Sequence, residues 1–417
     1  MSRLSRASIL NAPRGHQDRR VCRQAAPVLF GRQDDALAQA MGNVEGVSGK
    51  TQPGIVHCVS LLRVGGMEQV VKSLVTRPHA GTRQSVCVLR KAGIFSEEIA
   101  SAGVSVYADH LAGEATRFSG VRALLAAVRR EQGQVLHCHD LFAWRTAVLA
   151  RMATGGRLKV VFTKHGHFEH VSLPLRIMVK TLAAFTSRIV AVSEDIRREF
   201  ETRFGIGAEK VDVIMNGIDT SRFRIPLGKE EARRRLGLAP DSFVAGSVTR
   251  FFPVKNIEVQ LDMVERLSVR LPRLRYVLVA PPSEGGERII ADARRRKLGD
   301  RILFLGRRQD IPEILRAMDV FVLTSHSEGT SMALLEAMAS GCPAVVSRVG
   351  GNVRLVEDGA NGFLFEPGDI EGLCRRVTEL HDDPGLRELL AVETTARASG
   401  FGLPEMARRY QELYMSI

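Results

Sequence analysis

Residues 321–341 read FVLTSHSEGTSMALLEAMASG, and this stretch predicts a strand, a loop and a helix in succession. A short apolar run opens the stretch and is typical of a buried strand. Apolar side chains then return at helical spacing from Met332 onward. Thr330 and Ser331 stand directly before them and belong to the residue types that cap helix N-termini. The sequence therefore predicts a helix that starts near Thr330 or Ser331, after a polar loop that follows a strand.

The same strand-and-helix unit recurs along the first half of the chain. Short apolar runs alternate there with longer amphipathic ones, as in GIVHCVSLL (54–62) then GMEQVVKSLVTR (66–77), and QVLHCHD (134–140) then RTAVLARMATG (145–155). Nearly continuous apolar strands joined by helical crossovers are typical of a parallel sheet that is covered on both faces. The first half is therefore predicted to be a doubly wound α/β domain.

The pattern restarts after a turn-rich break at residues 211–242. FVAGSVTRF (243–251), LRYVLVAPP (274–282), RILFLGR (301–307) and DVFVLTS (319–325) supply a second set of strands with helices between them. We expect an α/β protein with two Rossmann-like, doubly wound parallel-sheet domains facing across a cleft. Because ligands of open α/β sheets bind beyond the carboxyl ends of the strands, the site is predicted in that cleft.

Four segments follow from these patterns. Residues 1–52 are rich in Arg, Gln and Gly without sustained periodicity, and they predict a disordered or weakly ordered extension. Residues 53–225 are predicted to form an N-terminal Rossmann-like domain and residues 226–398 a C-terminal Rossmann-like domain. Residues 399–417 predict a C-terminal helix that packs back across the domain boundary.

Charge and composition narrow the classes of partner. The chain of 417 residues carries a formal net charge of +13, which suits nucleic acid, an anionic membrane surface or a phosphorylated substrate. Nucleic acid is disfavoured, because one Trp and four Tyr offer no aromatic interleaving for base stacking. No apolar run is long enough to span a bilayer, and the N-terminus lacks the apolar core of a secretory signal. We expect a cytoplasmic protein with peripheral contact to the inner face of an anionic membrane.

The six cysteines carry no sign of a cysteine-based site. They are scattered along the chain without a CxxC pair. This spacing argues against a disulfide framework and against a zinc knuckle, and it favours reduced, buried thiols.

Two strand-end loops carry groups that suit a diphosphate. Gly65 and Gly66 follow the first strand, where paired glycines let backbone N–H groups and a helix N-terminus approach an anion. Arg250 and Lys255 follow the first strand of the second half, in GSVTRFFPVKN. Their positive charges suit a diphosphate whose negative charge grows as a bond breaks. The alternatives are a tight turn for the glycines and exposed surface cations for the basic pair.

The stretch from Glu328 to Glu336 suits the two sugars of a nucleotide-sugar. Carboxylates accept paired hydroxyl hydrogen bonds, so one glutamate suits sugar hydroxyls and the other a ribose diol. Gly329, Thr330 and Ser331 form the loop between them, and free N–H groups at the helix start can meet the connecting phosphates.

Four histidines follow two neighbouring strands. Alternation places His137 and His139 on one face, while His165 and His167 follow the next strand. A metal centre is conceivable from this pattern. Ordinary packing at the strand ends is the alternative for His137, His139 and Asp140.

Together these stretches resemble the GT-B glycosyltransferases, specifically the retaining family 4 group of bacterial cell-surface and exopolysaccharide sugar transferases. The resemblance covers about residues 54–395. The motifs that carry it are GGMEQ, HCHD, KHG, AVSEDIRREF, VIMNGID, GSVTRFFPVKN, EGTSMALLE and VGGNVRLVEDGANGFLFEPGD. One segment departs from the family pattern, because VAPPSEGGER stands where relatives carry GDGP near the nucleotide base.

The resemblance implies roles for individual residues. Glu328 and Glu336 match the family's paired glutamates, with Glu328 at the transferred sugar. Arg250 and Lys255 match its phosphate-binding residues, and His165 matches its active-site histidine. The resemblance also implies that residues 53–225 form the acceptor domain and residues 226–398 the donor domain. From their strand-end position, His137, His139 and Asp140 are candidates for the acceptor side, and His139 and Asp140 are the two that we predict there. No metal and no cofactor is expected, because Arg, Lys and helix dipoles replace the cation.

The implied activity is transfer of a sugar from a nucleotide-diphosphate sugar to a hydroxyl acceptor, with retention of anomeric configuration. The acceptor is expected to be a lipid-linked saccharide or a cell-surface polysaccharide intermediate. A GT-B UDP-sugar 2-epimerase, which has no acceptor, and a catalytically silent nucleotide-sugar binding protein remain as alternatives. Retention of Arg250, Lys255 and both glutamates argues against the silent protein.

Overall fold

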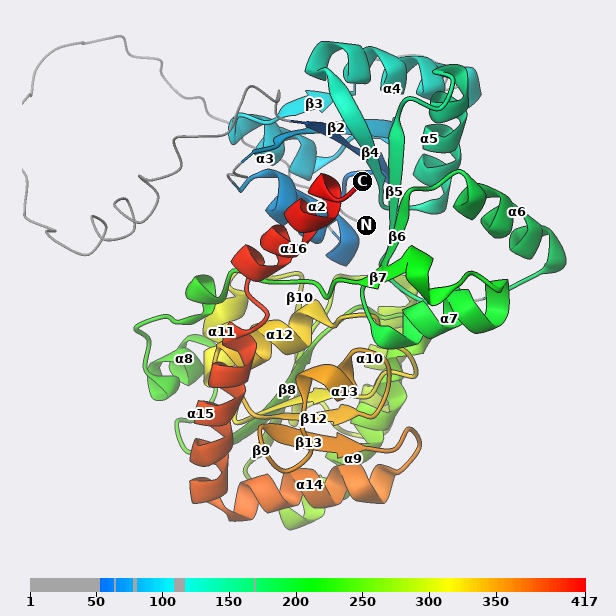
Figure 1. Ribbon diagram of the computed structural model, residues 1–417. Coiled ribbons are helices and arrows are strands. Elements are labelled where there is room, and N and C mark those ends of the chain that lie inside the picture. The colour runs from blue at the N-terminus through cyan, green and yellow to red at the C-terminus, as the bar shows by residue number, and fades with distance from the viewer. Residues whose placement is uncertain (1–52, 64, 78–80, 109–116, 169) are drawn as a thin grey trace, which may run out of the picture. The chain divides into compact units, whose positions relative to one another are not determined.

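The computed structural model describes residues 53–417, except Val64, residues 78–80, residues 109–116 and Glu169. The predicted N-terminal extension therefore lies outside the described residues. Two parallel sheets dominate the described chain, one in each half of the sequence (Figure 1). The prediction of two Rossmann-like parallel-sheet halves is confirmed.

The first sheet has seven parallel strands in the order β3-β2-β1-β4-β5-β6-β7. Its strands are β1 (Gly54–Leu61), β2 (Arg83–Lys91), β3 (Ser105–Tyr107), β4 (Gly133–Cys138), β5 (Lys159–Lys164), β6 (Arg188–Ala191) and β7 (Val211–Val213).

The second sheet has six parallel strands in the order β10-β9-β8-β11-β12-β13. Its strands are β8 (Phe243–Val248), β9 (Leu274–Val279), β10 (Ile302–Gly306), β11 (Val320–Leu323), β12 (Ala344–Ser347) and β13 (Gly362–Phe365). In both sheets the strand order reverses next to the first strand, which is where doubly wound folds place their ligands.

Helices connect successive parallel strands in both sheets. Those of the first half are α2 (Gly66–Val75), α3 (Ile94–Ser101), α4 (Arg117–Glu131), α5 (Leu141–Ala153), α6 (Leu173–Ala184) and α7 (Glu194–Phe204). The later ones are α8 (Lys229–Arg235), α9 (Ile257–Arg270), α10 (Glu284–Arg295), α11 (Ile311–Ala317), α12 (Met332–Ala339), α13 (Asn352–Leu355), α14 (Ile370–Asp382), α15 (Pro384–Ser399) and α16 (Leu403–Met415). Short 3-10 helices include η3 (Thr220–Phe223) and η4 (Pro253–Lys255).

The predicted start of α12 is confirmed. Ser331 is the residue before the helix, and its side chain accepts a hydrogen bond from the backbone N–H of Leu334. This bond satisfies one of the N–H groups that a helix start leaves without an internal partner. The cap therefore fixes the point at which the polar loop ends and the helix that carries Glu336 begins.

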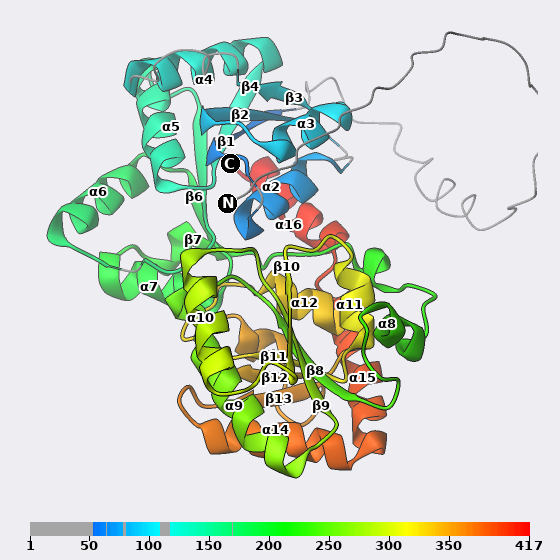
Figure 2. The same ribbon diagram turned by 180° about the vertical axis from the view of Figure 1, so that it is seen from behind.

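Helix α16 lies against the first sheet, although it follows the second half in the sequence. Its buried side chains share an apolar cluster with β1, β4, β5, β6 and α2, and Figures 1 and 2 both show α16 beside α2. The residues of this cluster are Ile55, Val70, Leu74, Val135, Val161, Val190, Ile214, Leu403, Met406, Tyr410, Leu413 and Tyr414. The end of the chain thus completes the core on one face of the first sheet.

Five of the cysteines lie in the described part of the chain and are buried, unpaired thiols. This agrees with the absence of CxxC spacing. Among the helices that the structure describes, none combines the length and apolar character needed to cross a bilayer.

Candidate functional site

A cavity of about 650 Å³ lies at the carboxyl ends of strands from both sheets. All of the predicted site residues line it except His139 and Asp140. The predicted residues on its wall are Gly65, Gly66, His165, Arg250, Lys255, Glu328, Gly329, Thr330, Ser331 and Glu336. The strand-end location explains why loops that are far apart in sequence meet here.

Lys255 and Glu328 form an ion pair on this wall. The ammonium nitrogen of Lys255, at the end of η4, lies 2.6 Å from Oε1 of Glu328, and the hydroxyl of Ser325 donates to the same oxygen at 2.6 Å. The two side chains are 17% and 7% exposed. The sequence predicted separate partners for them, a diphosphate and a sugar. The structure makes them one unit, so a ligand that meets one meets both.

Arg250, unlike Lys255, forms no ion pair with any described residue of the cavity wall. Its side chain is exposed, and the guanidinium carbon lies 4.8 Å from the ring centroid of Phe252. Among the described residues it pairs with no carboxylate. The guanidinium is therefore available to an anion in the cavity, and a ring supports it from one side.

The loop before α12 is held against the first half of the chain. A Cβ on Gly329 would stand 2.8 Å from the carbonyl oxygen of His165, so only glycine fits at this approach. The hydroxyl of Thr330 donates to the carbonyl of Val192 at 2.5 Å and accepts from the N–H of Asn216 at 3.3 Å. The Thr330 side chain is thus used to hold the loop and is not free for a phosphate.

Two further glycines support the same loop from the second half. A Cβ on Gly350 would lie 1.8 Å from the carbonyl oxygen of Glu328, and Gly350 has a φ of +49°. Gly351 donates its N–H to the carbonyl of Gly329 at 2.9 Å. The VGG motif at residues 349–351 therefore serves as a close backbone support for Glu328.

Glu336 lies on α12, and its surroundings raise the pKa of its carboxyl to about 7. Burial is the main cause, and the positive charge of Arg222 on η3 offsets part of it. No side-chain hydrogen bond of this carboxyl occurs within the described chain. Both of its oxygens are therefore open to hydroxyl groups of a ligand.

His165 lines the cavity and is neutral. Burial, followed by the charge of Lys164, lowers the pKa of its imidazole to about 3. Its Nε2 lies 3.1 Å from Nδ1 of His139, and its Nδ1 is buried without a hydrogen-bond partner. His165 can exchange hydrogen bonds with a ligand but carries no charge to offer it.

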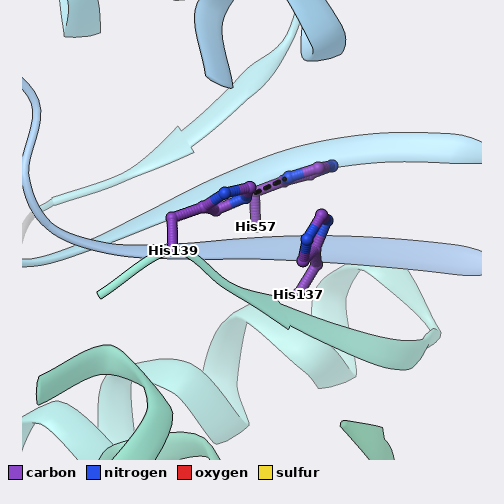
Figure 3. A group of neighbouring side chains, drawn as sticks. All are labelled: His57, His137 and His139. Atoms are coloured by element: carbon purple, nitrogen blue, oxygen red, sulfur yellow. Dashed lines mark hydrogen bonds between the residues drawn. The ribbon is translucent and has the colours of Figure 1, made fainter. Parts of the chain in front are cut away.

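The histidine group in the structure differs in part from the predicted one. His137 and His139 share one face of the sheet, and His57 on β1 joins them, so their ring nitrogens lie within 4.8 Å of one another (Figure 3). His167 departs from the predicted group, because its Nδ1 lies 3.2 Å from the carboxylate of Glu199. Spacing could not have revealed His57, which lies some eighty residues earlier in the chain.

Asp140 has a structural set of partners. Its carboxylate caps α5 by accepting from the N–H of Ala143 at 2.9 Å, and it also accepts from the N–H and the hydroxyl of Ser60 at 2.6 and 2.5 Å. These bonds tie the end of β1 to the start of α5. The acceptor-side role implied for Asp140 stays a prediction.

Sequence reasoning missed several residues of the cavity wall. Glu68 on α2 is one, since its carboxylate folds back over Gly65 and would lie 2.2 Å from a Cβ there. Burial raises the pKa of Glu68, and Arg250 counteracts this shift. Arg222 and Asn216 are others, and both lie in the turn-rich break between the halves. The only sequence signals were the GGMEQ motif for Glu68 and the VIMNGID motif for Asn216.

The wall near the second sheet is apolar where the sequence departs from the family pattern. Pro281, within VAPPSEGGER, lines the cavity together with Val279, Ile311, Pro312 and Leu323. These side chains form a surface suited to a flat ring, with Arg307 and Arg308 beside it.

Family models match both halves of the chain. The model described as Glycosyltransferase Family 4 matches residues 64–222, and the model described as Glycosyl transferases group 1 matches residues 228–397. The two matches meet in the turn-rich break between the sheets.

Individual relatives agree with these models. EpsF of Bacillus subtilis strain 168 is 30% identical over 314 residues, which cover 71% of this chain and 79% of EpsF. The UDP-Gal:α-D-GlcNAc-diphosphoundecaprenol α-1,3-galactosyltransferase of Escherichia coli is 29% identical, covering 71% of this chain and 78% of that enzyme.

A solved structure shares the architecture. The crystal structure of HepE of Anabaena in complex with UDP aligns with a TM-score of 0.77 at 25% identity, and it covers 87% of this chain and 100% of HepE. The sheets, the cavity and these similarities agree: the chain belongs to the family 4 glycosyltransferases and has the GT-B fold.

Proposed function

We propose that this glycosyltransferase moves a sugar from a uridine diphosphate donor to a hydroxyl of a lipid-linked or cell-surface glycan, with retention of anomeric configuration. The observation that carries the proposal is the 650 Å³ cavity whose wall combines Arg250, Lys255, Glu328 and Glu336. A nucleotide-sugar needs cations for its phosphates and hydrogen-bond acceptors for its two sugars, and this wall offers both.

The diphosphate would lie between Arg250 and the start of α2. Arg250 pairs with no carboxylate in the described chain. A Cβ added to Gly66 would have no other atom within 4 Å, so there is room for a ligand beside this glycine. A guanidinium and a helix N-terminus are both favourable to phosphate oxygens. Lys255 would contribute its charge as part of its pair with Glu328.

The two glutamates would take the two sugars. Glu336 has no side-chain hydrogen bond among the described residues, so its carboxylate can accept both hydroxyls of a ribose diol. Glu328 keeps Oε1 for Lys255 and Ser325, which leaves Oε2 for a hydroxyl of the transferred sugar. The uracil would stack in the apolar wall near Pro281. The uridine choice is supported by the UDP bound to HepE and by the UDP-Gal named for the Escherichia coli relative.

The reaction needs no protein nucleophile in this proposal. The bond between the anomeric carbon and the leaving phosphate oxygen breaks, and a bond from the same carbon to the acceptor oxygen forms on the same face. The proton of the acceptor hydroxyl passes to the leaving phosphate. Arg250 and Lys255 stabilise the charge that grows on the diphosphate, which is the role a metal ion takes in other transferases.

A lipid-linked acceptor agrees with the surface of the first half. The Escherichia coli relative acts, by its name, on a diphosphoundecaprenol carrier. On α6, Leu173 and Ile177 are 67% and 58% exposed, and Arg176 and Lys180 are exposed on the same helix. Apolar and basic side chains together favour contact with an anionic membrane. This supports a cytoplasmic enzyme that works at the inner face of the membrane.

The test begins with the donor. Nucleotides that bind only the folded protein raise its melting temperature, so a panel of UDP, GDP, ADP and TDP should single out UDP. Purified protein with UDP-sugars should then release UDP at a rate that rises when a prenyl-diphosphate glycan is added. Release that is equally fast without acceptor favours the 2-epimerase or simple hydrolysis. Stabilisation without any release indicates a silent binding protein.

A further inference from the structure

A continuous series of hydrogen bonds runs from strand β2 of the first sheet to the cavity. Gln84 Oε1 lies 2.7 Å from Nε2 of His57, and Nδ1 of His57 lies 3.0 Å from Nε2 of His139. Nδ1 of His139 then lies 3.1 Å from Nε2 of His165, which lines the cavity. Three imidazoles thus link a glutamine side chain to the proposed substrate site.

Strand order places these groups in line. Gln84 lies on β2, His57 on β1, His139 directly after β4 and His165 directly after β5, and these four strands are consecutive neighbours in the sheet. Figure 3 shows the rings of His57 and His139 joined edge to edge, with His137 beside them. His137 belongs to a separate branch, since its nitrogens lie 2.6 Å from the hydroxyl of Tyr414 and 2.7 Å from that of Thr163.

His139 and His165 in this hydrogen-bonded series are neutral, and His57 is fully buried, which favours its neutral form. Burial lowers the pKa of His139 well below its usual value and that of His165 to about 3. A neutral imidazole has one N–H donor and one bare nitrogen acceptor. Each hydrogen bond therefore fixes which nitrogen of the next ring holds the proton.

Gln84 sets the direction. Its amide nitrogen donates to the hydroxyl of Thr82 at 2.9 Å, so its oxygen faces His57 and accepts from Nε2–H. His57 Nδ1 is then bare and accepts from His139 Nε2–H. His139 Nδ1 accepts in turn from His165 Nε2–H. This leaves Nδ1 of His165 bare, and an unpartnered buried acceptor is more readily tolerated than an unpartnered N–H.

We propose that Gln84 and His57 are positioning residues that fix the tautomer of His165, so that its Nδ1 is a hydrogen-bond acceptor for a hydroxyl of the bound sugar. The role of that hydroxyl rests on the proposed function, whereas the tautomer does not. Nε2 is already used by His139, so Nδ1 is the only polar side-chain atom that His165 can offer.

This arrangement selects a class of sugar. A neutral, bare nitrogen accepts from a hydroxyl but repels a carboxylate, which has no proton to donate to it. The enzyme should therefore prefer donors with a neutral hydroxyl at this position over the matching uronic acid.

A metal ion would need the same nitrogens. Both ring nitrogens of His57, His137 and His139 already have hydrogen-bond partners in the described structure. In this proposal the ring nitrogens of the cluster in Figure 3 serve to order protons.

Nitrogen-15 NMR of histidine-labelled full-length protein tests the tautomer without any substrate. The chain has eleven histidines, and His165→Gln identifies the signals of His165 by their loss. We expect an unprotonated Nδ1 and a protonated Nε2 in the wild type. A protonated Nδ1 overturns the proposal even if no variant folds.

Variants then test the role of Gln84. Gln84→Leu removes the acceptor and should convert His165 to a mixture of tautomers, whereas Gln84→Glu keeps an acceptor and should retain the wild-type tautomer. Tyr414→Phe is the matched control, because it removes a buried hydrogen bond from the His137 branch only. An unchanged His165 in Gln84→Leu contradicts the proposal.

Kinetics with the donor found in the nucleotide panel adds a second readout. Gln84→Leu should lower kcat/KM by up to about tenfold, the value of one hydrogen bond, and should reduce the preference for the neutral sugar over its uronic acid. Gln84→Glu and Tyr414→Phe should keep that preference. If no donor is turned over, the proposed function fails while the NMR result stands by itself. If Gln84→Leu keeps the wild-type preference, the proposed selection is wrong.

Discussion

Arg250 is the residue whose loss should separate catalysis from binding most clearly. A diphosphate gains negative charge as the sugar leaves, so a cation beside it matters more in the transition state than in the ground state. We expect Arg250→Ala to lower kcat by roughly a hundredfold, about 3 kcal/mol in the barrier, with a smaller change in donor Kd. Arg273→Ala is the control, because Arg273 pairs with Asp241 on the surface and does not line the cavity. Wild-type turnover in folded Arg250→Ala refutes the phosphate assignment.

Lys255 cannot be examined alone, because it neutralises Glu328. Lys255→Ala leaves a carboxylate that is 7% exposed without its cation, and loss of one partner from such a pair costs roughly 3 kcal/mol of unfolding free energy. The double variant Lys255→Ala with Glu328→Gln removes both charges and should recover much of that loss. Urea denaturation of the wild type, the two single variants and the double variant measures this coupling. Equal stability of Lys255→Ala and the double variant rules out the coupling.

Glu336 should make donor binding depend on pH near neutrality. With its pKa raised to about 7, the carboxyl is mostly protonated at pH 6 and mostly ionised at pH 8. The ionised form accepts both ribose hydroxyls, so donor affinity should rise with pH by up to about tenfold over this range. The diphosphate also titrates, and for this reason the comparison is the ratio of wild-type to Glu336→Gln Kd, measured by calorimetry at each pH. A constant ratio contradicts the ribose assignment.

The raised pKa of Glu336 also determines how this carboxyl makes the stability of the folded protein depend on pH. The folded protein holds this proton up to about pH 7, while an unfolded glutamate loses it near 4.5. The carboxyl thus contributes stability that is fully present below pH 4.5 and is lost as pH rises toward 7. The melting temperature of the wild type should therefore fall more steeply between pH 4.5 and 7 than that of Glu336→Gln.

At the scale of elements, the loop between β11 and α12 depends on glycine to approach the first half. A methyl group on Gly329 would stand 2.8 Å from the carbonyl oxygen of His165, so Gly329→Ala must move the loop that carries Glu328. We expect kcat/KM to fall by roughly tenfold to a hundredfold, since small displacements of positioning groups are costly. Unfolding free energy should fall by only about 1–3 kcal/mol.

Gly299→Ala is the control for that experiment. Gly299 is exposed and has no atom within 4 Å of its would-be Cβ. Both variants are compared by steady-state kinetics and by denaturation. Full activity in Gly329→Ala shows that the close approach has no part in placing Glu328.

Elements were also the level at which the sequence was most informative. The alternation of apolar and amphipathic runs predicted both sheets, and Ser331 predicted the start of α12, because capping and burial are local properties. Thr330 shows the limit. Its place before a helix predicted that its N–H could meet a phosphate, and this stays a prediction. The hydrogen bonds of its hydroxyl to Val192 and Asn216 arise only in the tertiary fold and could not be predicted. His57 shows the same limit, since only strand order brings it to His139.

For the whole molecule, we expect activity to be independent of added metal. Arg250, Lys255 and the start of α2 supply positive potential to the proposed diphosphate position, and the described histidine cluster has its ring nitrogens in hydrogen bonds. Protein dialysed against EDTA, and verified as metal-free by mass spectrometry, should keep its turnover within about twofold of the untreated enzyme, far less than the effect of losing a catalytic cation. Inactivation that Mn²⁺ or Zn²⁺ reverses would restore the metal hypothesis.

The position of α16 has a consequence for synthesis on the ribosome. Strands β1, β4 and β5 emerge early, but Tyr410 and Tyr414, which cover one of their faces, are among the last residues to be translated. At usual elongation rates this face waits roughly ten to fifty seconds for its cover. The half of the protein that is made first is therefore completed last, and its uncovered strands are a natural client for chaperones that hold nascent chains. A premature stop codon within α16 removes few residues but leaves one face of the first-made sheet uncovered.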